Sequence, residues 1–182
     1  MKFFLSNFLI GDDFSYIFKN EKRGLVEFSF IISPTEDHLC ERYKVFLQQF
    51  LRKLDRYPLY IHVLDESNDI SISEIAEMKK VGPGKFYHFA KIENEVELVQ
   101  HFQKIYLDAF NNENVLLSSE KYVEIDPNGE VGQCRFIFDY RMNYLEERFY
   151  LWIGFDGIGW DFIANFTDYP YNELPIKNEM DL

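Results

Sequence analysis

The side chains best suited to chemistry are scattered along the chain rather than grouped in a known pattern. The four histidines lack the HxH or HExxH spacing of a zinc site. His62 and His88 each fall in a run typical of a strand, and would approach each other if those strands pair; the alternative is that both are structural and partly buried. Cys40 and Cys134 lack CxxC spacing and a recognisable nucleophile setting. We therefore expect buried free thiols, no metal and no cofactor.

Two turn sequences match only parts of known ligand-binding motifs. The DPNGE stretch at 126–130 begins like a calcium loop, but the spacing of further oxygen ligands then fails. The GPGK stretch at 82–85 lacks the full phosphate-loop pattern, and the residues after it favour a strand rather than a helix. Both stretches are typical of turns.

Acidic side chains in the C-terminal third could include a general acid/base pair of the glycosidase kind. The ordinary interpretation is that they are exposed on the solvent face of a sheet. We expect that the chain is not an enzyme; a small cytosolic enzyme that uses carboxylate or histidine chemistry is an alternative. The acids concerned are Asp139, Glu146, Glu147, Asp156 and Asp161.

The charge of the chain is uneven. Its net charge is −12, with 16 acidic and 14 basic residues in 1–104 but 15 acidic and only 5 basic residues in 105–182. Direct nucleic-acid binding is disfavoured, because it requires a basic footprint. The acidic part would attract a basic partner or a cation, unless its charge serves only solubility.

The same acidic part is rich in aromatic residues: 13 of the 33 aromatics lie in 136–171. Aromatic side chains favour interface hot spots and acids steer a basic partner, so a subset of these residues is predicted to bind a partner. The alternative is that the aromatics fill the core against the helices. The predicted partner-binding residues are Asp139, Tyr140, Glu146, Glu147, Trp152, Asp156, Trp160, Asp161 and Asp168.

These residues must be positioned by an α+β fold. Residues 1–58 predict an N-terminal strand, a hairpin from 14–19 and 24–32, and a helix that ends before Pro58. Residues 59–111 predict a strand over 59–64, a short helix over 73–80, a strand over 86–91 and a helix over 93–111. The C-terminal third predicts an antiparallel four-stranded meander packed against the two main helices, with turns at Asn128-Gly129 and Asp156-Gly157.

We expect a single domain over 1–182. It comprises a first region (1–104), the end of the second helix with the acidic meander (105–166) and an irregular tail (167–182). No run of 18 apolar residues occurs, so no membrane association is expected, and cysteine usage fits the cytoplasm.

In size, acidity and the acidic aromatic segment Tyr140–Tyr171, the chain resembles bacterial immunity proteins of toxin–immunity pairs, including those of contact-dependent growth inhibition. The resemblance implies a protein that binds a cognate, basic toxin domain, such as a nuclease, and blocks its active or substrate-binding surface. Such a protein would be a monomer or a homodimer. A structural adaptor that pairs through a sheet edge is a further alternative.

Overall fold

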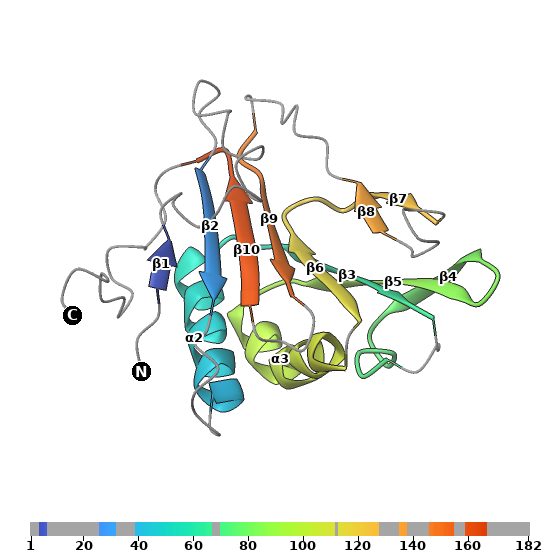
Figure 1. The fold of residues 1–182 in the computed structure, drawn as a ribbon, viewed down its shortest axis with the longest axis horizontal. Helices are drawn as coiled ribbons and strands as arrows, with labels where there is room; N and C mark the ends of the chain where they lie inside the picture. The colour runs from blue at the N-terminus through green and yellow to red at the C-terminus, as the bar shows by residue number, and fades with distance from the viewer. Residues whose placement is uncertain are drawn as a thin grey trace.

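The computed structural model describes residues 4–6, 26–31, 39–66, 70–111, 113–127, 135–137, 146–154 and 159–166. Among these residues, two helices lie against one face of an eight-stranded antiparallel sheet, and a separate two-stranded sheet lies toward its other face (Figure 1). This arrangement confirms the predicted α+β class. We call the face that packs against the helices the inner face and the opposite face the outer face.

The main sheet joins strands from both ends of the described chain. β3 is the third strand from the β4 edge and is buried on both faces, which explains why its sequence is apolar at nearly every position. The order across the sheet is β1 (Phe4–Ser6), β2 (Val26–Ile31), β10 (Gly159–Ala164), β9 (Phe149–Ile153), β6 (Asn114–Ser118), β3 (Leu59–Asp65), β5 (Lys85–Ile92) and β4 (Glu77–Gly82).

The two helices are amphipathic, as the spacing of their apolar residues predicts. α2 (Leu39–Leu54) and α3 (Glu95–Phe110) each bury one stripe of side chains. Asn94 caps α3: its side-chain oxygen accepts a hydrogen bond from the Glu97 N–H at 3.1 Å, and the Glu97 carboxylate accepts one from the Glu93 N–H at 2.9 Å. These bonds satisfy N–H groups that a helix start otherwise leaves unpaired.

The main core lies between the helices and the inner face. Phe50 of α2 contacts Trp160 and Phe162 of β10, with ring centroids 4.7 and 5.2 Å apart. Phe102 and Ile105 of α3 belong to the same buried cluster. Burying an apolar side chain of this size contributes roughly 1.5–3 kcal/mol, so this core holds the helices and the sheet together.

The C-terminal strands divide between two sheets, which refines the predicted four-stranded meander. β9 and β10 form an antiparallel hairpin inside the main sheet. β7 (Glu124–Asp126) and β8 (Arg135–Ile137) pair with each other instead and cover part of the outer face. Phe136 and Ile125 pack there against apolar side chains of the main sheet, so the small sheet is held by its own apolar side.

Two elements differ from the sequence-based expectations. The predicted helix over 73–80 is wrong, because residues 71–75 form a turn and Glu77–Gly82 is strand β4. The turn at Gly82-Pro83-Gly84 joins β4 to β5, and pairing with β5 overrides the helix preference of the residues in 77–80. The strand β6 was not predicted, yet it links β3 to β9 and so joins the two halves of the sheet.

Several predictions fall outside the described residues. These are the strand over 14–19, the turn at Asn128-Gly129, the turn at Asp156-Gly157 and the tail 167–182. The strands on either side of 155–158 do pair as the hairpin prediction requires, with Trp160 opposite Ile153.

Candidate functional site

The two tryptophans of the predicted partner surface lie on opposite faces of the sheet. Trp160 is 1% exposed and packs in the inner core, so its prediction as a partner-binding residue is wrong. A strand alternates its faces, and Trp160 lies on the face that the helices cover. Trp152 is half-buried on the outer face, directly opposite the half-buried Asp161 in the β9–β10 pairing. The structure thus brings Trp152 and Asp161 together.

The exposed acids of the predicted surface are engaged within the chain. Glu146 accepts a hydrogen bond from the Arg148 guanidinium at 2.9 Å. Glu147 pairs with Arg56 of the segment after α2 at 2.7 Å. Both pairs are open to solvent, so each contributes little to stability and can exchange for a partner's cation. The predicted residues Asp139, Tyr140, Asp156 and Asp168 lie outside the described residues.

The strands that contain His62 and His88 pair, but the two side chains do not meet. His62 lies opposite Phe89 and His88 lies opposite Val63, so the two histidines are offset by one residue in the strand register. They therefore point to opposite faces of the sheet. Each is buried and belongs to a separate polar network, which supports the structural interpretation of both.

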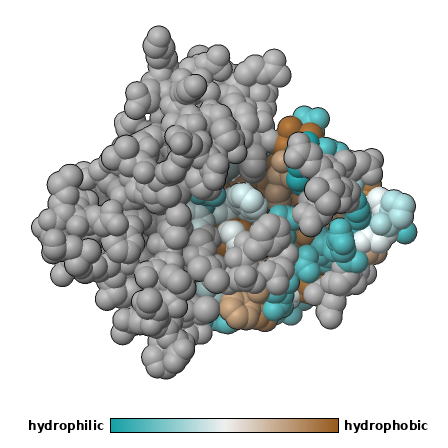
Figure 2. Space-filling model, in the orientation of Figure 1, coloured by the Kyte–Doolittle hydropathy of each residue, from teal (hydrophilic) through white to brown (hydrophobic). Residues whose placement is uncertain are grey.

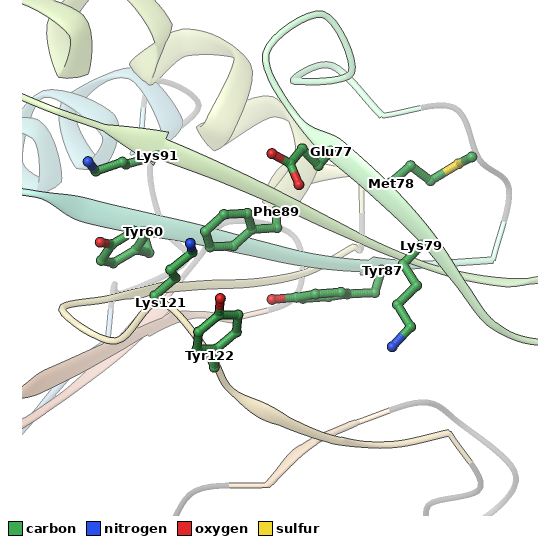
Figure 3. A pocket seen from close by; sticks show the side chains of 9 residues that line it. All are labelled: Tyr60, Glu77, Met78, Lys79, Tyr87, Phe89, Lys91, Lys121 and Tyr122. Atoms are coloured by element: carbon green, nitrogen blue, oxygen red, sulfur yellow. The ribbon is translucent and has the colours of Figure 1, made fainter.

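A groove on the outer face collects lysine and aromatic side chains at the β4 end of the sheet. It consists of two adjoining cavities of about 410 and 440 Å³, which share Lys79, Tyr87 and Tyr122 as lining residues. β3, β4 and β5 form the floor of the groove, and the segment 121–127 forms its wall. We call it the lysine–aromatic groove; Figure 3 shows the side chains around its first cavity.

Aromatic rings form the floor of the lysine–aromatic groove. Tyr60 and Phe89 stack with centroids 5.6 Å apart, and Tyr87 stacks on His62 at 6.0 Å. Paired positions of β3 and β5 place these rings on one face of the sheet. Tyr122 is 80% exposed at the opposite wall, so the groove offers aromatic surface on two sides.

The charge of the groove is opposite to that of the whole chain. Lys79, Lys80, Lys91 and Lys121 line its two cavities, against one acidic residue, Glu77. All four lysines are exposed. The Lys91 ammonium pairs with Glu93 at 2.6 Å, and the Lys121 ammonium lies 5.2 Å from the Tyr122 ring centroid. The described surface near this end is mixed, with hydrophilic and hydrophobic residues side by side (Figure 2).

The groove was not predicted from the sequence, because its residues come from four separate parts of the chain: β3, β4, β5 and the segment 121–127. The one sequence feature that indicates the groove is the FYHFAK run at 86–91, whose alternation puts Tyr87, Phe89 and Lys91 on one face. Lys79 joins them only through the β4–β5 pairing, where it lies opposite Tyr87. A helix over 73–80, as predicted from the sequence, could not pair with β5.

Two partly buried hydrogen bonds of His62 fix the floor of the groove to its wall. His62 Nε2 is 3.0 Å from the Glu120 carbonyl oxygen, and His62 Nδ1 is 2.7 Å from the Tyr87 hydroxyl. Burial lowers the pKa of His62 to about 4, so the ring is neutral. A carbonyl oxygen only accepts, so Nε2 carries the proton and Nδ1 accepts from the Tyr87 hydroxyl. His62 thereby positions Tyr87 and the segment that carries Lys121 and Tyr122.

A second polar cluster lies on the inner face near the end of α3. His88 Nε2 is 3.2 Å from Asp65 Oδ2, and both side chains are almost fully buried. Asp108 accepts hydrogen bonds from the backbone N–H groups of residues 71 and 72 at 2.5 and 3.2 Å. Burial and the carboxylates of Asp65 and Asp108 raise the pKa of Glu113 to about 7. This cluster anchors the turn before β4 to α3.

Within the described part of the chain, no group of histidine, cysteine and acidic residues could hold a metal ion. The described helices include none that is long and apolar enough to cross a membrane. Comparison with family models, with curated proteins and with solved structures finds no match for this chain.

Proposed function

We propose that this protein is an inhibitor of the immunity type, which binds a cognate toxin domain and blocks its functional surface. The observation that supports it best is the outer face of the sheet. Half-exposed aromatic side chains lie there beside charged ones, at Trp152 and Asp161 and again in the lysine–aromatic groove. Such a combination of rigid aromatic anchors and charges is typical of interface centres.

The overall charge of −12 supports a partner that is basic on most of its contact surface. Long-range attraction between opposite net charges accelerates encounter, and local charge pairs then fix the orientation of docking. A basic nuclease domain fits this description, since it carries positive charge to bind a polyanion. The inhibitor would occupy that positive surface and exclude the substrate.

The proposal is tested by co-purification with the product of the adjacent upstream gene, because immunity genes lie beside their toxin genes. We expect a stable complex with the unaltered chain and a loss of affinity of about tenfold or more for Asp161→Lys, since that change reverses a charge beside Trp152. Asp161 is half-buried on the sheet surface, and thermal unfolding of the variant verifies that it folds.

Glu74→Lys is the matched control, because it makes the same charge change on the helix side of the molecule. Glu74 is exposed and pairs with Lys104 of α3. An exposed pair contributes little to stability, so this variant should fold and bind normally. A complex that fails to form, or one that Asp161→Lys and Glu74→Lys weaken equally, would contradict the proposal.

A further inference from the structure

The lysine–aromatic groove has a local charge that the net charge of the chain does not explain. Four lysines and one acid line it, in a protein with 31 acidic and 19 basic residues. No described side chain forms an ion pair with Lys79 or Lys121. Preventing aggregation is one role of exposed lysines on an edge strand. That role does not require aromatic rings beside them or Lys121 on the opposite wall.

We infer that this groove binds an extended acidic segment of the partner that also carries an aromatic or apolar side chain. Carboxylates of the segment would lie against the ammonium groups of Lys79 and Lys121, and its apolar side chain would lie on the rings of Tyr60 and Phe89. The inference deepens the proposed function, since it names the part of the partner that enters this site.

The shape of the groove supports an extended occupant. Its two cavities adjoin along the β4–β5 hairpin, between the floor strands and the segment 121–127. Lys85 of the floor strand β5 donates a hydrogen bond to the Pro127 carbonyl oxygen at 2.7 Å, and this bond joins the floor to the wall at the far end. The His62–Tyr87 hydrogen bond fixes the floor. The floor and the wall are thus held in place before a ligand arrives, which reduces the entropy lost on binding.

Single-stranded nucleic acid also combines negative charge with aromatic rings, and grooves of lysine and aromatic residues can bind it. A polynucleotide, however, continues beyond the groove along a protein whose net charge is −12. Each further phosphate would then meet an unfavourable field. A protein segment can be acidic over only a few residues, so its charge can match the groove alone. Charge complementarity therefore favours a peptide.

The test measures fluorescence anisotropy of labelled peptides with the full chain. The probe is a short Glu-Glu-Phe repeat, and its control is the Gln-Gln-Phe repeat, which has the same shape without charge. We expect the acidic peptide to bind at least about tenfold more tightly, although the net charge of the protein opposes it, and added salt should weaken this binding. The double variant Lys79→Gln/Lys121→Gln should abolish the preference.

Lys53→Gln on α2 is the matched lysine control and should leave binding unchanged, because Lys53 is exposed on the helix side. Tyr122→Ser tests the aromatic wall and should weaken binding several-fold without a change of charge. Equal binding of the two peptides, no binding, or an unaltered preference in the double lysine variant overturns the inference. So does tighter, lysine-dependent binding of oligodeoxythymidine. No toxin is present, so failure here is distinct from failure of toxin capture.

Discussion

At the scale of single residues, the most informative side chain is His62. Its sequence context suggested a strand histidine that could meet His88, and the structure instead gives it two hydrogen bonds on the outer face. One bond reaches Tyr87 in the floor of the lysine–aromatic groove, and the other reaches the Glu120 carbonyl beside its wall. His62 is therefore a positioning residue for the groove rather than a group that contacts a ligand.

We expect His62 to remain neutral, with the proton on Nε2, well below the pH at which histidine usually titrates. Its pKa is lowered to about 4 by burial, from 6.5 in the unfolded chain. The unfolded chain thus binds the proton first as pH falls, so folding loses stability between pH 6.5 and about 4. The loss reaches at most roughly 3 kcal/mol. Nitrogen-15 NMR of the ring measures the tautomer and the pKa.

His62→Gln provides the control for this pH dependence. A glutamine amide can donate to the Glu120 carbonyl and accept from the Tyr87 hydroxyl, yet it does not titrate. Denaturant unfolding at several pH values should show a smaller loss of stability in acid for this variant than for the unaltered chain. A ring that titrates near pH 6.5, or the same pH dependence in both proteins, would refute this role for His62.

At the scale of elements, α3 is held by a cap that the structure defines fully. Asn94→Ala should remove the hydrogen bond to the Glu97 N–H and lower the free energy of unfolding by about 1 kcal/mol. Chemical denaturation measures this loss. Gln103→Ala, at an exposed position inside the same helix, should cost nothing, because alanine favours the helix. Equal stability of the two variants would show that the cap contributes nothing.

The elements that could be predicted are those whose local pattern agrees with their tertiary surroundings. α3 has strong apolar periodicity and β3 is a nearly continuous apolar run, and both were predicted close to their observed bounds. β4 could not be predicted, because Glu77, Met78 and Lys79 are exposed at a sheet edge. The sequence there lacks the alternation of apolar and polar residues that is typical of a strand. β6 is a short apolar run after a helix, and only its partners β3 and β9 identify it as a strand.

The candidate site was harder to predict than the fold, for a geometric reason. Trp152 and Trp160 are similar in sequence context, but strand register places one on the outer face and the other in the core. The lysine–aromatic groove combines β3, β4, β5 and the segment after β6, so no local pattern contains it. Composition indicated that aromatics and charges meet at a surface, but only the strand pairing shows which ones.

At the scale of the whole molecule, the charges divide into two parts of unequal extent. Residues 105–182 carry 15 acidic and 5 basic residues, and the lysine–aromatic groove concentrates positive charge at the β4 end of the outer face. A partner with a basic surface and one acidic segment would match both parts in a single orientation. Such a pattern favours one docking register over others, because a shifted partner brings like charges together.

We propose that the partner binds the outer face, and the two tryptophans of the chain can distinguish this face from the core. Trp152 is half-buried on the outer face, whereas Trp160 is 1% exposed in the inner core. Two-dimensional NMR of the nitrogen-15-labelled chain gives one indole N–H signal for each, assigned with Trp152→Phe. On addition of the neighbouring gene's product, we expect a shifted Trp152 signal and an unchanged Trp160 signal. An unchanged Trp152 signal in a formed complex would contradict it.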